Sequence, residues 1–128
     1  MYNETILQRF QNPKNAGVLK GADGKGEVGN VQCGDIMNMY ITVNRGGTIT
    51  DAKFKTFGCV TAIVAADIAC DLVRGKHIDD AVKITNKHVL DVMGEVPAQK
   101  VHCSVIAEEV IKKAVENYKK NLEKAKKK

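Results

Sequence analysis

Met37-Asn38-Met39-Tyr40-Ile41-Thr42-Val43 alternates apolar and polar side chains. This period of two is typical of a β-strand with one face in a core and the other in water. The turn residues Arg45-Gly46-Gly47 follow, and a second alternating stretch then places Ala52, Phe54 and Thr56 on one face. The two stretches predict an antiparallel hairpin at the centre of the fold.

Helices are predicted on both sides of this hairpin. Residues 60–73 are apolar almost all round, which indicates a buried helix that begins at about Cys59. Apolar residues at helical spacing predict further helices at 2–10 with Asn3 as N-cap, at 78–84, at 86–93 and at 101–122. The glycine-rich stretch before the hairpin holds one irregular strand around Glu27–Val31. We therefore predict an α+β fold, in which a small three-stranded antiparallel sheet packs against C-terminal helices and a helix stands at the N-terminus.

The composition is that of a single domain covering residues 1–128. With 44% hydrophobic and 27% charged residues, the chain can build an ordinary globular core. No apolar run is long enough to span a bilayer, and the first residues lack the pattern of a signal peptide. We therefore expect a cytoplasmic protein with no membrane partner, whose cysteines stay reduced and serve metals or catalysis more often than disulfides.

The formal net charge of +5 arises mostly from a lysine-rich tail at about 119–128. Lysines suit the negative end of a helix, so a solvated helix end explains the tail. A nucleic-acid-binding patch is the competing interpretation, but aromatic residues make up only 5% of the chain and offer no set for base stacking. Nucleic acid is therefore not an expected partner. The last helix is predicted to bury one stripe, formed by Ala107, Ile111, Ala114, Val115, Tyr118 and Leu122.

Three of the four cysteines lie beside other potential metal ligands. Cys33 stands two residues before Asp35, Cys59 follows the predicted sheet, and His102 directly precedes Cys103. Three thiols with a carboxylate and an imidazole make a ligand set for a soft metal or an iron–sulfur centre. The three segments could converge at one end of the sheet.

Position in a helix separates the cysteines further. Cys59 and Cys103 each fall in the first turn of a predicted helix, where free backbone N–H groups favour a thiolate. The competing interpretation of any single cysteine is a small buried hydrophobe. That is our prediction for Cys70, which lies in mid-helix between Ala69 and Leu72.

Longer motifs around these residues resemble the IscU/NifU N-terminal-domain family of iron–sulfur cluster assembly scaffold proteins. The matching stretches are Asn12-Pro13-Lys14-Asn15, Cys33-Gly34-Asp35-Ile36-Met37, the residues from Asp51 to Cys59, and those from Lys100 to Glu109. They occur in order, and the similarity covers nearly the whole chain up to about residue 119.

The resemblance implies a scaffold rather than an enzyme. Such a scaffold accepts persulfide sulfur from a cysteine desulfurase, receives iron, and transfers the cluster to apo-proteins. The implied ligands are Cys33, Cys59 and Cys103, with Asp35 or His102 as the fourth and Cys103 as the persulfide acceptor. The cluster could be [2Fe-2S] or [4Fe-4S], zinc could occupy the same ligands, and both a monomer and a homodimer remain open. A cluster that is handed on implies an exposed site.

Two departures from the family pattern bear on access to the cluster site and on which partners bind. Val60 follows the second cysteine, where the family usually has a small residue. Val96-Pro97-Ala98-Gln99-Lys100 stands in place of a Leu-Pro-Pro-Val-Lys loop, so an Hsp70-type chaperone is not carried over as a partner. The alternative function is a zinc-dependent sulfurtransferase-type partner of a cysteine desulfurase. Proteins of that type carry an extra segment between the second and third cysteines, which this chain lacks.

Overall fold

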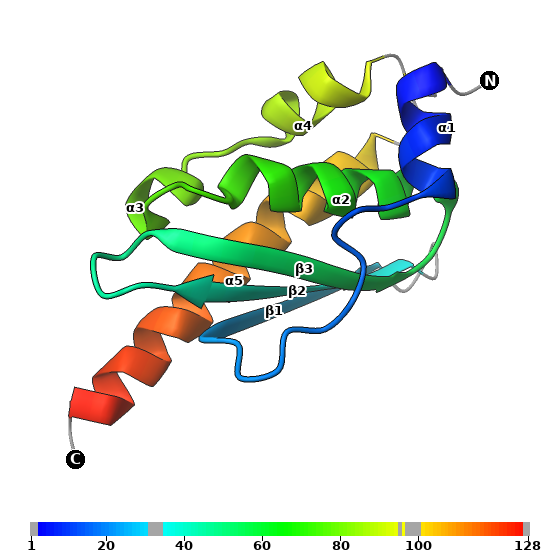
Figure 1. Cartoon of the computed structure of the whole chain (residues 1–128). Helices are drawn as coiled ribbons and strands as arrows, with labels where there is room; N and C mark the ends of the chain where they lie inside the picture. The colour runs from blue at the N-terminus through cyan, green and yellow to red at the C-terminus, as the bar shows by residue number, and fades with distance from the viewer. Residues whose placement is uncertain (1–2, 31–34, 95, 97–100, 127–128) are drawn as a thin grey trace.

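The structure is a computed structural model, and it describes residues 3–30, 35–94, 96 and 101–126. Along the chain its elements are α1 (Glu4–Gln11), β1 (Gly24–Asn30), β2 (Asp35–Val43), β3 (Ile49–Phe57), α2 (Val60–Val73), α3 (Ile78–Ala81), α4 (Asn86–Met93) and α5 (His102–Lys126), as Figure 1 shows. The α+β prediction is confirmed. The helices predicted at 60–73 and 86–93 have those bounds, whereas α3 is shorter than predicted and α5 is longer.

The three strands form one antiparallel sheet in the order β1-β2-β3. Met37, Met39 and Ile41 of β2 are buried, and Met39 lies opposite the buried Phe54 of β3. The residues between them are partly exposed, so the predicted hairpin and its alternation are confirmed. Strand β1 begins at Gly24, earlier than the irregular strand predicted around Glu27–Val31; Val31 itself lies outside the described residues.

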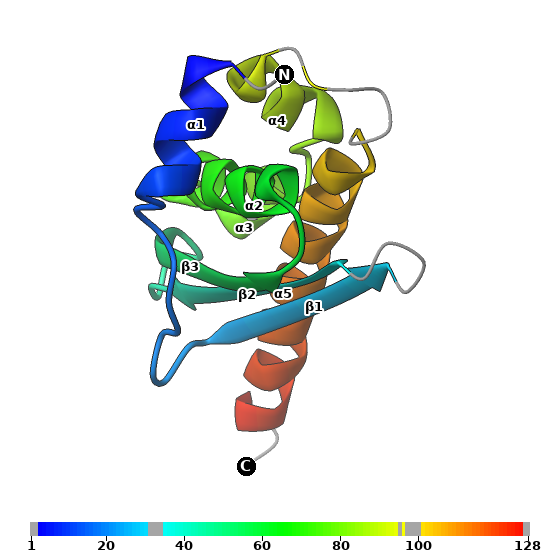
Figure 2. The same ribbon diagram turned by 90° about the vertical axis from the view of Figure 1, so that its right-hand side faces the viewer.

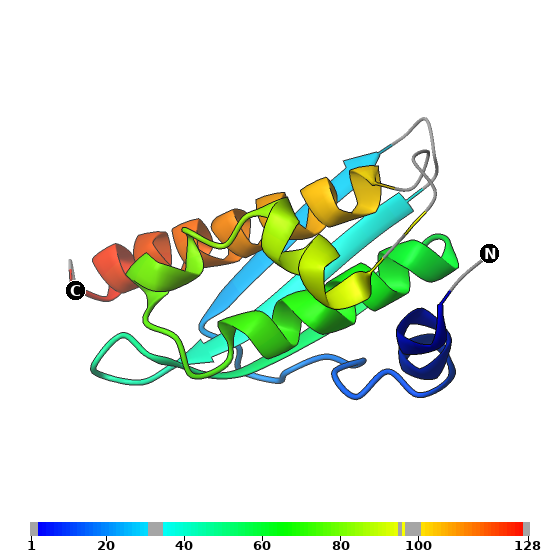
Figure 3. The ribbon, with the colours of Figure 1, turned by 90° about the horizontal axis from the view of Figure 1, so that it is seen from above.

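Helices cover one face of the sheet. Helix α5 packs against β1 and β2, helix α2 packs against β3, and the two helices pack against each other. Figures 2 and 3 show α2 and α5 side by side over the strands, with α4 lying across both. The core lies between this helical layer and the inward side chains of the sheet, and it includes Ile6 from α1.

Helix α5 crosses β1 at backbone contact distance. A Cβ atom on Gly26 would lie 2.6 Å from the carbonyl oxygen of Val110, and one on Gly24 would lie 2.5 Å from that of Ala114. Glycine in a strand is typical of a place where another backbone comes this close. The glycine-rich segment therefore forms a strand, β1, whose glycines let α5 pack directly on its backbone.

The last turns of α5 extend past the sheet (Figure 1). Ala107, Ile111, Ala114 and Val115 are buried as predicted, and Tyr118 is partly buried. Leu122 is 41% exposed, so its assignment to the buried stripe was wrong. The physical reason is that no strand lies beneath this turn of the helix. The lysine-rich tail continues the helix as far as Lys126.

The N-terminal segment covers the outer edge of β3. Asn3 caps α1 by accepting a hydrogen bond from the backbone N–H of Ile6, as predicted. Further on, the N–H of Phe54 donates to the Asn15 carbonyl oxygen at 2.9 Å, and the N–H of Gly17 donates to the Phe54 carbonyl oxygen at 2.8 Å. These bonds occupy backbone groups that an edge strand would otherwise leave open. Within the described part of the chain, no helix is both long and apolar enough to cross a membrane.

Candidate functional site

Cys59 occupies the N-cap position of α2, two residues after β3 ends at Phe57. The backbone of Cys59 is extended, and its carbonyl oxygen accepts the N–H groups of Ala62 and Ile63. Its side chain is partly buried and packs against the core. The connection between sheet and helix therefore sets this thiol at the end of the sheet where β2 begins and β3 finishes.

His102 and Cys103 are the first two residues of α5, and they bring a thiol and an imidazole to Cys59. The Sγ atoms of Cys59 and Cys103 are 3.7 Å apart, and the Nε2 atom of His102 is 3.6 Å from the Sγ atom of Cys103. Residues 44 positions apart in sequence thus lie in contact because α2 and α5 pack together. Cys59 and His102 are partly buried, whereas Cys103 is fully buried. The reason is that its helix turn packs against the core.

Of the other two candidate ligands, Asp35 and Cys33, the structure describes only the backbone of Asp35. Asp35 begins β2, and because its neighbour Ile36 pairs with Phe57, the Asp35 backbone lies at the same end of the sheet as Cys59. Its side chain and the whole of Cys33 lie outside the described residues, as do Pro97 to Lys100 of the divergent loop. Among the residues that are described, no group of three or more His, Cys, Asp or Glu side chains could hold a metal ion.

Cys70, His77 and His88 have structural roles, one in the core and two at the starts of helices. Cys70 is fully buried in α2, as predicted, and burial raises the pKa of its thiol. His77 caps α3, since its Nδ1 atom accepts the N–H of Asp79. His88 accepts the backbone N–H of Thr85 in a capping box at the start of α4.

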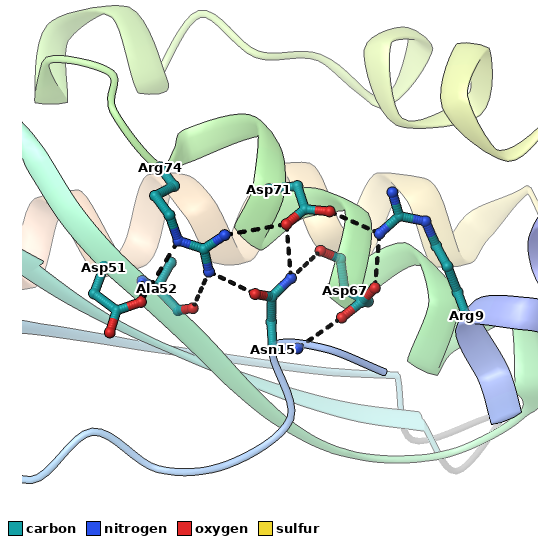
Figure 4. Close-up of polar contacts among 7 residues, drawn as sticks. All are labelled: Arg9, Asn15, Asp51, Ala52, Asp67, Asp71 and Arg74. Atoms are coloured by element: carbon teal, nitrogen blue, oxygen red, sulfur yellow. Dashed lines mark hydrogen bonds and ion pairs between the residues drawn. The ribbon is translucent and has the colours of Figure 1, made fainter. Parts of the chain in front are cut away.

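A polar network that the sequence analysis missed holds the N-terminal segment to α2 (Figure 4). Asp67, fully buried, accepts from the Arg9 guanidinium at 2.7 Å and from the Asn15 backbone N–H at 2.9 Å. Asp71 accepts from Arg9 at 2.8 Å and from the Asn15 side chain at 3.0 Å, and Arg74 closes the network by donating to Asn15. The available signal was Asp67 itself, a charged residue directly between the apolar Ala66 and Ile68, because a buried charge requires a partner.

The fold and the site together define a class of protein: a small α+β domain with a cysteine–histidine cluster where the sheet ends and two helices begin. The chain belongs to the family described as the NifU-like N terminal domain, whose family model matches residues 1–125. The predicted membership of the IscU/NifU family is therefore confirmed.

Curated relatives are similar over most of the chain. The iron–sulfur cluster assembly scaffold protein IscU 1 of Archaeoglobus fulgidus is 43% identical over 118 residues, which is 92% of this chain and 76% of that protein. The scaffold protein IscU of Escherichia coli K12 is 40% identical over 125 residues, 95% of this chain and 97% of that protein. The nitrogen fixation protein NifU of Azotobacter chroococcum is 40% identical, but the match spans only 38% of its length.

Solved structures share the fold. A putative iron–sulfur cluster assembly scaffold protein for the SUF system from Fervidobacterium islandicum superposes with a TM-score of 0.74 at 20% identity, covering 89% of this chain and 96% of that chain. A NifU-like N-terminal structure from Brucella abortus has a TM-score of 0.70 at 16% identity, covering 92% and 94%. At these identities the likeness is one of fold.

Proposed function

We propose that this protein is a scaffold for de novo iron–sulfur cluster assembly, which accepts sulfur from a cysteine desulfurase together with iron and transfers the cluster to apo-proteins. The observation that carries the proposal is the meeting of Cys59, His102 and Cys103 at one end of the sheet. Relatives at about 40% identity over most of the chain are named as scaffolds of this kind, which supports the same role here.

The proposed cluster ligands are Cys33, Cys59 and Cys103, with Asp35 or His102 as the fourth. Thiolate sulfur is the usual ligand of iron–sulfur iron, and a carboxylate is a harder and weaker partner that would keep a cluster labile. Cys103 is the proposed persulfide acceptor. Because its side chain is buried, we expect that local opening of the first turn of α5 exposes it to the sulfur donor.

The proposed role is that of an assembly platform and not an enzyme, so the chemistry comes from its partners. Those partners are a cysteine desulfurase and the apo-proteins that receive a [2Fe-2S] or [4Fe-4S] cluster. Zinc can occupy the same ligands in purified protein. The zinc-dependent sulfurtransferase alternative is not favoured, since the curated relatives above are named for scaffolding or nitrogen fixation. We place the protein in the cytoplasm, as one functional unit over residues 1–128.

Anaerobic reconstitution tests this proposal. The reduced protein, treated with iron and sulfide, should develop visible absorption bands and bind both elements, and Mössbauer spectra would give the nuclearity. Cys59→Ser and Cys103→Ser should lose the cluster. Cys70→Ser is the matched control, because Cys70 lies in the core of α2, and it should keep the cluster. A colourless, sulfide-free wild-type protein would contradict the proposal.

A further inference from the structure

Cluster assembly from a persulfide has an electron requirement. The terminal sulfur of a persulfide is at the oxidation level of elemental sulfur, whereas the sulfur of a cluster is sulfide. Two electrons must therefore reach each sulfur atom before it can bridge iron. A thiol next to the persulfide can supply them, because a thiolate attacks a sulfur–sulfur bond and displaces the other sulfur.

The cysteine pair has the geometry for this reaction. The Sγ atom of Cys59 is 3.7 Å from the Sγ atom of Cys103, which is van der Waals contact between two sulfur atoms. Both thiols stand at the start of helices that are packed together, so their separation is set by the core. Holding two reacting atoms at this distance replaces an encounter between molecules with an intramolecular step.

We propose that Cys59 is the resolving thiol that reduces the persulfide on Cys103, an inference that rests on the proposed function. The Cys59 sulfur attacks the Sγ atom of Cys103, and a Cys59–Cys103 disulfide bond forms. The bond from Cys103 to the terminal sulfur breaks, and that sulfur leaves as hydrosulfide with the bonding electron pair and the proton from Cys59. The terminal sulfur is reduced by two electrons, and the two cysteines are oxidised by two electrons.

The difference in exposure between Cys59 and Cys103 suits reduction of their disulfide back to two thiols. Cys103 is fully buried, whereas Cys59 is only partly buried. An external dithiol reductant would attack the more accessible Cys59 sulfur and release the Cys103 thiol for the next persulfide. Cys70 cannot substitute for Cys59, because it is enclosed in the core in the middle of α2.

A single-turnover experiment without iron tests this inference. Metal-free full-length protein, with a chelator, is loaded by an immobilised cysteine desulfurase with one equivalent of L-cysteine and no other thiol, and is then separated from the resin and from unreacted L-cysteine. Wild-type protein should release hydrosulfide and gain one Cys59–Cys103 disulfide per sulfide, as detected by peptide mapping without reduction. Cys59→Ser should keep the extra sulfur on Cys103 and release sulfide at least about tenfold more slowly. Cys70→Ser is the matched control and should release it at the wild-type rate.

Several results would overturn the inference. These are a persulfide that persists in the wild-type protein, release that is unchanged in Cys59→Ser, and a disulfide that joins Cys103 to Cys33. Inorganic polysulfide serves as a second source of sulfur, and failure of both sources to load Cys103 also overturns it. Reconstitution with iron and free sulfide needs no persulfide, so the scaffold function is judged separately by that experiment.

Discussion

At the scale of single residues, Asp67 places a negative charge on the buried face of α2. Its side chain is 1% exposed, and the Arg9 guanidinium lies 2.7 Å from its Oδ2 atom. Its Oδ1 atom accepts the backbone N–H of Asn15. A buried carboxylate is tolerated only when it is paired and hydrogen-bonded. Asp67 therefore ties the N-terminal segment to the helix that begins at Cys59.

Replacing Arg9 tests this tie. Arg9→Met leaves the buried Asp67 carboxylate without its cation, and we expect the free energy of unfolding to fall by about 2 kcal/mol. Urea denaturation followed by circular dichroism measures the change. Arg45→Met is the matched control, since Arg45 is exposed in the β2–β3 turn, and it should change stability little. Equal effects of the two substitutions would contradict the assigned role of Arg9.

Asp71 should make the stability of the protein depend on pH. Partial burial acts to raise the pKa of Asp71, but hydrogen bonds from Arg9, Asn15 and Arg74 outweigh it, and the net pKa lies below the ordinary 3.8. A lowered folded pKa stabilises the protein above the unfolded pKa, and this contribution is lost as the pH falls through the folded pKa. Asp71→Asn should therefore be less stable than wild type at pH 7. The difference should shrink below about pH 4, as measured by denaturation across that range. A difference that stays constant with pH would count against this charge effect.

At the scale of elements, the contact between β1 and α5 depends on the absence of side chains. A Cβ atom at Gly26 would lie within 3 Å of two backbone atoms of α5, the Val110 oxygen and the Ala114 nitrogen, and a helix backbone cannot yield as a flexible side chain can. This contact brings α5 down onto the sheet and sets where its first turn, with Cys103, stands.

Gly26→Ala should push α5 away from β1. Overpacking of this kind costs about 2 kcal/mol in the free energy of unfolding. Thermal and urea denaturation would measure the loss. Gly46→Ala is the control, since a Cβ atom there meets only the Asn44 Oδ1 atom at 3.4 Å in an exposed turn. If the two variants were equally stable, the close approach of α5 would not be the reason for glycine at position 26.

At the scale of the whole molecule, those proposed ligands that fall in the described part of the chain come from three elements that are distant in sequence. Asp35 begins β2, Cys59 caps α2, and His102 and Cys103 begin α5. A cluster bound between them would link the sheet to both main helices. A ligand that binds only the folded state stabilises it in proportion to its occupancy.

Cluster loading should therefore raise the melting temperature. We expect the reconstituted protein to unfold several degrees above the metal-free protein, because about 1 kcal/mol shifts the midpoint by 2–8 °C in domains of this size range. Anaerobic differential scanning calorimetry measures the midpoint. The metal-free and reconstituted forms of Cys59→Ser should melt together, while Cys70→Ser should keep the increase. If the melting temperature of the wild-type protein did not change on cluster loading, the cluster would lie away from these elements.

The sequence by itself determined the elements and the candidate chemistry. Alternation in 37–43 and the apolar run in 60–73 predicted β2 and α2, because whether a strand or a helix buries one face depends on side-chain spacing within a few residues. The Asn3 cap and the buried Cys70 followed from equally local rules. The ordered motifs around the cysteines resembled those of the family, and the match of the family model confirms that resemblance.

Only the tertiary structure decided how these parts meet. The contact between Cys59 and Cys103 joins residues 44 positions apart, and the bond from Arg9 to Asp67 spans 58 positions. No local pattern specifies such distances, since they depend on how α2 and α5 pack over the sheet. The exposure of Leu122 was mispredicted for the same reason: helical spacing shows which side of a helix is apolar, but the length of the sheet beneath it decides where that side stops being covered.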